Sequence, residues 1–130
     1  MDAFDSDALI YAAAPDNVLG RRVSRLVDGA DRGVGSVLLL PELLVKPMRN
    51  NNESERSRLL ELLGRIDLLA CDRPTAELAV ELGAKYRLRA ADATHLATAV
   101  NAGADRFITN NRDDFTTSII EIDIVYPTEL

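Results

Sequence analysis

The sequence predicts an α/β fold in which helices cover both faces of a parallel sheet. Short apolar segments typical of strands alternate along the chain with longer amphipathic segments typical of helices. One short segment, 36–40, is apolar at every position after its first serine, as expected for a strand buried on both faces. With 130 residues, 47% of them hydrophobic and 28% charged, the chain is expected to form one globular domain over residues 1–130.

Strands are predicted where short apolar segments are bounded by polar or turn-forming residues. The first, around Phe4, is very short and stops at Asp5. Gly33 and Gly35 are expected to punctuate the chain before the second strand. The remaining predicted strands cover 36–40, 66–70, 106–109 and 120–125.

Helices are predicted where apolar residues recur every three or four positions. The expected segments are a helical turn at 9–14 and helices at 18–26, from 42 onward, at 53–66, at 76–86 and at 91–102. Their ends carry capping signals, namely Asp16 or Asn17, the Asn50–Asn52 cluster, Thr75 and, at a carboxyl end, Gly103. Pro47 is expected to break or kink the helix that begins near Glu42.

Composition disfavours several classes of protein. The longest apolar runs, such as 37–40, are far shorter than the ~20 residues that a membrane-spanning helix needs. The amino terminus carries acids where a secretory signal carries basic residues, so we expect a cytoplasmic protein. The single cysteine, Cys71, permits no intrachain disulfide and no cysteine-based zinc site, and the single histidine, His95, excludes a histidine-rich metal site.

The net charge of −6 disfavours a nucleic-acid-binding protein that works through bulk positive charge. Every one of the 15 basic residues except Lys46 and Lys85 is arginine, which suits phosphate groups well. Local phosphate-binding patches therefore stay open, although a general compositional bias toward arginine would explain the same excess.

Acidic side chains are expected to gather at one edge of the sheet, because ligands of such sheets bind beyond the carboxyl ends of the strands. Asp5 ends the first strand, Glu42 opens the helix after the second, and Asp92 lies in the first turn of the last helix. The predicted strand at 106–109 is followed by Asn111 and Asp114. Taken alone, each acid is also compatible with helix capping, the helix dipole or a solvated loop.

Such a cluster of acids favours a metal site. Converging carboxylates repel one another by ~1 kcal/mol or more per pair at short range. Mg²⁺ and Mn²⁺ favour carboxylate oxygens and remove that repulsion. No histidine, cysteine or lysine falls at these strand ends, so the chemistry that the residues support best is metal-assisted phosphodiester hydrolysis.

Three segments of the chain resemble the PIN domain, specifically the compact toxin nucleases of prokaryotic VapBC toxin–antitoxin pairs. They are FDSDALIYA at 4–12, LPELLVKPMR at 40–49 and LRAADATHLATAVNAGADRFITNN at 88–111. The third is the most specific, since it combines D-A-x-H-L-A-T-A with G-A-D-x-F-x-T-N. The resemblance covers essentially the whole chain and implies a three-layer α/β/α sandwich around a mostly parallel sheet.

The resemblance also implies which side chains form the site. Asp5, Glu42 and Asp92 fall on the family's first three acids, so they are expected to bind Mg²⁺ or Mn²⁺ and to be catalytic. The family's fourth acid usually follows T-N, where this chain has Asn111, which can coordinate through its carbonyl oxygen but brings no charge. Asp114 or Asp113 is the expected substitute, and occupancy by a second metal ion stays open.

Three neighbours of these residues are candidates for supporting roles. Asp7 is a possible outer-shell acid, and Thr109 is either a water-orienting residue or a plain strand residue. His95 follows Asp92 by one helical turn and is expected to have a structural or outer-shell role.

The resemblance implies an RNA substrate, often tRNA or rRNA, together with a VapB-type antitoxin that inhibits the enzyme, and a homodimer. In-line attack by water is expected to leave 5′-phosphate and 3′-hydroxyl ends. Arg87, Arg89 and Arg112 are the candidates for contacts with the RNA backbone. A basic antitoxin tail would suit an acidic pocket that lacks its cation.

Two other functions stay open at this point. Asp5-Ser6-Asp7 resembles the D-x-D segment of haloacid-dehalogenase-type phosphatases, but the late lysine of that family is missing, because no lysine follows Lys85. A catalytically weak PIN-like domain that only binds a partner is also compatible with the sequence, because Asn111 replaces an acid.

Overall fold

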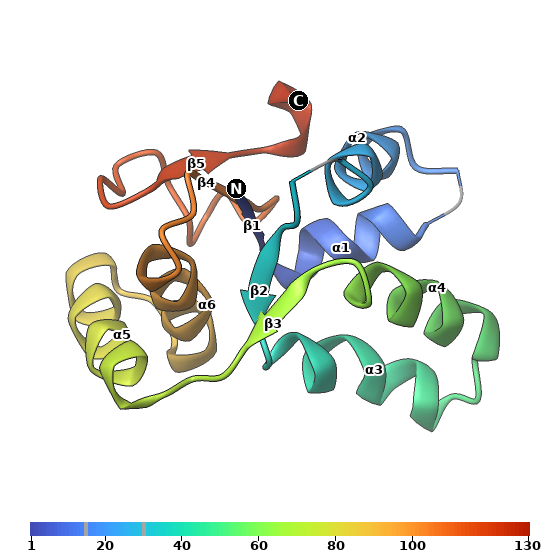
Figure 1. The fold of residues 1–130 in the computed structure, drawn as a ribbon, viewed down its shortest axis with the longest axis horizontal. Helices are drawn as coiled ribbons and strands as arrows, with labels where there is room; N and C mark the ends of the chain where they lie inside the picture. Colours follow the sequence, from blue (N-terminus) through green and yellow to red (C-terminus); the bar gives the residue numbers. More distant parts are fainter. Residues whose placement is uncertain (15, 30) are drawn as a thin grey trace.

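A computed structural model describes residues 1–14, 16–29 and 31–130. The fold has three layers (Figure 1). Five strands form one sheet in the order β3-β2-β1-β4-β5, and every pairing among the described strands is parallel. Helices α1 to α4 pack on one face, while α5 and α6 cover the other. The predicted α/β/α sandwich is therefore confirmed.

The elements follow one another in the alternating order that the sequence predicts. The strands are β1 (Asp2–Phe4), β2 (Val34–Ser36), β3 (Asp67–Leu69), β4 (Arg106–Ile108) and β5 (Asp123–Val125). The helices are α1 (Ser6–Ala13), α2 (Val18–Val27), α3 (Leu39–Arg49), α4 (Glu53–Leu63), α5 (Arg73–Tyr86) and α6 (Ala90–Asn101), with a short 3₁₀ helix at Pro127–Glu129. Within the described residues, no helix combines the length and apolarity needed to span a bilayer.

Strands β1, β3, β4 and β5 each contribute to two hydrophobic cores, because successive side chains of a strand point to opposite faces. Phe107 of β4 joins the core beneath α5 and α6, and its neighbour Ile108 joins the core shared by α1 to α4. Ala3 and Phe4 of β1 divide in the same way. The sheet is thus covered on both faces, and its strand ends are the places where polar side chains can meet.

The prediction of a strand at 36–40 is wrong. The strand is instead β2, Val34–Ser36, and α3 has already begun at Leu39. Leu39 and Leu43 are both buried one helical turn apart, so Leu39 of the leucine run lies on the inner face of a helix. Gly35, expected to punctuate the chain, lies within β2, where Leu39 packs so closely that a Cβ atom would overlap it.

Two predictions about helix ends are also wrong. Pro47 does not break α3, which continues to Arg49; the proline stands near the end of the helix, so only a late backbone bond is lost, and its ring is buried. Asp72 rather than Thr75 caps α5, because its carboxylate accepts a hydrogen bond from the Thr75 backbone N–H at 3.0 Å.

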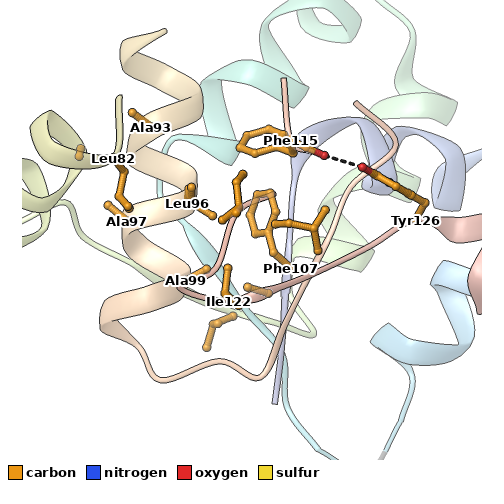
Figure 2. Close-up of a cluster of buried hydrophobic side chains, with 14 residues drawn as sticks. Leu82, Ala93, Leu96, Ala97, Ala99, Phe107, Phe115, Ile122 and Tyr126 are labelled. Atoms are coloured by element: carbon orange, nitrogen blue, oxygen red, sulfur yellow. Dashed lines mark hydrogen bonds between the residues drawn. The ribbon is translucent and has the colours of Figure 1, made fainter. Parts of the chain in front are cut away.

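The long loop after β4 is held down by a buried hydrogen bond. The hydroxyl of Tyr126 donates to the backbone carbonyl of Phe115 at 2.7 Å, and the Phe115 ring packs on Phe107 with the ring centroids 4.9 Å apart (Figure 2). The core beneath α6 therefore fixes the loop between Asn111 and Phe115.

Replacing Tyr126 by Phe is expected to lower the free energy of unfolding by about 1–3 kcal/mol, because the Phe115 carbonyl would lose its buried donor. Tyr86→Phe is the matched control, since the Tyr86 hydroxyl bonds Glu121 and the Ile120 backbone N–H at an exposed place that water can reach. Urea unfolding of both variants measures the difference, and equal losses would contradict the anchoring role of Tyr126.

Candidate functional site

The candidate site lies where the order of the strands reverses, beyond the carboxyl ends of β1 and β4. Asp5 follows β1 directly and is only 3% exposed. Its Oδ1 atom accepts a hydrogen bond from the Ser6 backbone N–H at 2.9 Å, which caps α1. Its Oδ2 atom accepts a hydrogen bond from the Thr109 hydroxyl at 2.8 Å. One carboxylate therefore joins the first strand to both the first helix and the fourth strand.

Thr109 is fully buried and connects three parts of the site. Besides donating to Asp5, its hydroxyl accepts a hydrogen bond from the Asn111 backbone N–H at 3.1 Å. The neighbouring Asn110 backbone N–H donates to Oδ1 of Asp7 at 3.1 Å. The predicted supporting residues Asp7 and Thr109 thus hold the chain after β4 against the start of α1.

Glu42 and His95 meet across the sheet edge. Glu42 lies in the first turn of α3, and its Oε1 atom is 2.7 Å from Nε2 of His95 in α6. Only 1% of the His95 side chain is exposed, compared with 32% of the Glu42 side chain. His95, expected in a structural or outer-shell role, is therefore in direct contact with a predicted site acid.

Asn111 and Asp114 bond to each other. The amide of Asn111 donates to Oδ2 of Asp114 at 2.9 Å, and its Oδ1 atom accepts from the Asp114 backbone N–H at 3.3 Å. Asp114 in turn lies close enough to Asp92, in the first turn of α6, to act on the charge of its carboxyl.

The electrostatics of the pocket are unfavourable for ionised carboxylates. Burial raises the pKa of Asp5 to about 7, and the neighbouring charge of Asp7 adds to the rise, against the opposing hydrogen bond from Thr109. Burial also raises the pKa of Asp7. The pKa of Asp92 is raised by burial and then by the charges of Asp114 and Glu42. Burial and the neighbouring carboxylates therefore disfavour the ionised forms of these acids.

The predicted acids thus gather at one edge, linked through shared neighbours. His95 bonds Glu42 and lowers the pKa of both Asp5 and Asp92, so it lies among the three predicted acids. Across residues 1–14, 16–29 and 31–130, no three histidine, cysteine, aspartate or glutamate side chains are arranged to hold a metal ion as they stand.

The chemistry of the side chains nevertheless fits a hard divalent cation. The available donors are carboxylate and amide oxygens, which Mg²⁺ and Mn²⁺ prefer. Besides burial, the charge of Asp7 raises the pKa of Asp5, the charges of Asp114 and Glu42 raise that of Asp92, and a bound cation would offset such repulsion. Asp5, Glu42 and Asp92 are therefore suitable ligands.

Sequence reasoning missed two features of the site. The contact between Glu42 and His95 joins residues from different layers, and no spacing in the sequence indicates it. Arg112, a candidate for RNA contact, is engaged elsewhere: its guanidinium lies 4.2 Å from the centre of the Tyr126 ring and donates to the Thr128 hydroxyl at 2.7 Å. Arg87 and Arg89 are exposed between α5 and α6.

The arrangement of a parallel α/β/α sandwich with acids at its strand ends defines the class of the protein. The sequence model of the PIN domain matches residues 3–117, so the chain belongs to the PIN domain family, a family of nucleases. The haloacid-dehalogenase-type interpretation loses its basis with this assignment. No curated protein matches the chain.

Solved structures share this fold over nearly the whole chain. The toxin–antitoxin complex from Klebsiella pneumoniae is 24% identical, with 100% of both chains covered and a TM-score of 0.79. VapBC2 from Rickettsia felis, bound to a DNA fragment from its promoter, is 16% identical over 96% of this chain and 97% of that chain, with a TM-score of 0.77. FitAcB from Neisseria gonorrhoeae is 18% identical, with 100% of both chains covered and a TM-score of 0.75. At these identities, the likeness establishes the fold.

Replacing Asp5 by Asn is expected to stabilise the metal-free protein. Because the folded pKa of Asp5 lies above its unfolded value, ionisation of this carboxyl destabilises the fold increasingly from about pH 4 to about pH 7. The variant should therefore gain roughly 1–3 kcal/mol at about pH 8 and less at about pH 5.

Thermal unfolding in EDTA at both pH values measures this gain. Asp123→Asn, at the opposite end of the sheet on an exposed position of β5, is the matched control and should change little. A loss of stability in the Asp5 variant at about pH 8 would contradict the inference that the ionised Asp5 carboxylate destabilises the fold.

Proposed function

We propose that this protein is a Mg²⁺- or Mn²⁺-dependent endoribonuclease that acts in the cytoplasm as the toxin of a toxin–antitoxin pair. The observation that carries the proposal is the buried Asp5 carboxylate, whose pKa is raised to about 7 at the strand edge where the other acids of a PIN domain meet. Phosphodiester hydrolysis by divalent cations is the chemistry that such an oxygen-rich pocket suits.

In this proposal, Asp5, Glu42 and Asp92 hold the cation directly or through water, and Asn111 with Asp114 completes the pocket. When bound, the cation supplies Lewis acidity that polarises the phosphodiester and activates water for in-line attack. The chain contributes the positions of its carboxylates, which the Thr109 hydroxyl and the two helix starts hold in place.

Arg87 and Arg89 are proposed to bind the RNA backbone. Both are exposed, and Arg89 stands at the start of α6, one turn before Asp92. Arginine binds phosphate in a bidentate manner, so an exposed pair beside the acids would place a phosphodiester at the pocket. The proposed substrate is an RNA such as tRNA or rRNA.

We further propose an inhibitory antitoxin of VapB type and a homodimer as the partners. The structures from Klebsiella pneumoniae and Rickettsia felis that share the fold are described as toxin–antitoxin and VapBC assemblies, which supports the first. An acidic pocket without its cation would attract a basic segment of the antitoxin. Val45 and Met48, 56% and 58% exposed on one face of α3, offer an apolar surface for a second copy.

Replacing Asp92 by Asn is expected to lower RNA cleavage by roughly a hundredfold or more, because one ligand charge is lost from the site. Asp123→Asn, at the other end of the sheet, should cleave as the wild type does. Sequencing of RNA ends after expression of each variant is the measurement, with 5′-phosphate and 3′-hydroxyl ends expected. Undiminished cleavage by the Asp92 variant would refute the assignment of the site.

A catalytically weak, partner-binding PIN domain is the second candidate. The observation that favours it is Asn111, which occupies the place of an acid and spends its amide on Asp114. Calorimetric titration with Mn²⁺ separates the two functions: the nuclease should bind Mn²⁺, and Asp5→Asn should weaken binding at least about tenfold. A wild-type protein that binds no Mn²⁺ would favour the partner-binding domain.

A further inference from the structure

His95 makes one side-chain hydrogen bond within the described part of the chain, although it lies almost completely in the interior. Its Nε2 atom is 2.7 Å from Oε1 of Glu42, while 1% of the side chain is exposed. The other ring nitrogen, Nδ1, is buried and has no hydrogen-bond partner among the described residues. The presence of a buried imidazole with one unpartnered nitrogen requires a physical explanation.

The unpartnered Nδ1 atom determines where the ring carries its proton. A buried N–H group without an acceptor is costly, so a proton on Nδ1 is disfavoured. A proton on Nε2 points to the Glu42 carboxylate at hydrogen-bonding distance. Nε2 therefore donates the hydrogen bond, and Oε1 of Glu42 accepts it.

Stability alone does not account for this histidine. A hydrogen bond to a charged acceptor stabilises the fold, and burying a polar ring with one unpartnered nitrogen costs a free energy of similar size. An apolar side chain of similar size would fill the same space without an unpartnered nitrogen. The gain from the hydrogen bond and the cost of burying the ring nearly cancel. The main effect of the bond is therefore on the orientation of Glu42.

Glu42 needs such orientation. It extends from the first turn of an exposed stretch of α3, and a glutamate with 32% of its side chain exposed would otherwise sample several rotamers. The bond to His95 holds Oε1 on the buried side. The second oxygen, Oε2, accepts no hydrogen bond from the described residues, and the charge of Glu42 raises the pKa of Asp92.

We propose that His95 is a positioning residue that orients the Glu42 carboxylate for a divalent cation. The proposal rests on the metal-dependent function proposed above. His95 itself touches neither the cation nor RNA, and it acts only through Glu42. Groups that orient a metal ligand in this way typically strengthen metal binding by about 10–100-fold.

Three variants at this position test the proposal by calorimetric titration of the metal-free protein with Mn²⁺, without RNA. His95→Leu keeps the volume and removes the donor, so Mn²⁺ binding should weaken by about 10–100-fold. His95→Gln should restore most of the affinity, because its amide nitrogen can take the place of Nε2. His95→Asn should not, because its shorter amide reaches only the place of Nδ1.

Two controls separate orientation from packing. Thr98→Val removes another buried polar group from α6, one turn further on, and should leave Mn²⁺ affinity unchanged. In a Glu42→Gln background, His95→Leu should cause no further loss, since the residue that it orients is already altered. Should His95→Leu fail to fold, the contrast between Gln and Asn carries the same test.

The outcomes distinguish this proposal from the proposed function. Wild-type affinity in His95→Leu, or equal affinities in the Gln and Asn variants, would overturn the positioning role while leaving the metal site intact. A wild-type protein that does not bind Mn²⁺ would overturn both.

Discussion

The parallel pairing of β1 with β4 is the constraint on which the rest of the site depends. It brings together Asp5 and Thr109, which are 104 residues apart, and the Asp5 backbone N–H extends the ladder by donating to the Ile108 carbonyl at 3.0 Å. Since β1 and β4 stand where the strand order reverses, the chain must leave the sheet in opposite directions there. That divergence opens the space in which the carboxylates meet.

The same constraint explains why the ionised form of Asp5 is disfavoured. Asp5 is both a helix cap and a strand end, so the backbone holds it in the interior whatever its charge. Its pKa rises because burial disfavours the ionised form and Asp7 stands nearby. A fold that builds negative charge into its interior in this way is suited to a ligand of opposite sign, and the proposed cation and the proposed basic antitoxin segment both have that property.

Much of this architecture could be predicted from the sequence. The alternation of short apolar and longer amphipathic segments predicted the parallel sheet, and Asp5, Glu42 and Asp92 were expected at its carboxyl edge because of their places relative to strands and helices. The leucine run after Ser36 misled the prediction, since a short apolar run suits a buried strand and the inner face of a helix equally well. Packing of Leu39 and Leu43 against the interior decides between them.

The contacts inside the site could not be predicted, because they join side chains from different layers. The bond between His95 and Glu42 depends on how α3 and α6 cross the edge of the sheet, which no local pattern encodes. Pro47 was expected to break or kink a helix because a local rule was applied without its tertiary context, in which the buried ring lies inside a helix that continues to Arg49. Local rules placed the residues at the edge, and tertiary packing decides which of them touch.

The carboxyl-terminal segment has a consequence for reading genetic data. The Tyr126 hydroxyl bonds the loop that carries Asn111 and Asp114. Arg112 of that loop packs on the Tyr126 ring and donates to the Thr128 hydroxyl. Arg22 of α2 holds the same segment by donating to the Thr128 carbonyl at 3.1 Å. A screen for inactive variants should therefore recover substitutions in this tail that never meet a nucleic acid, and mapping such hits as contact points would draw a binding surface on the wrong part of the molecule.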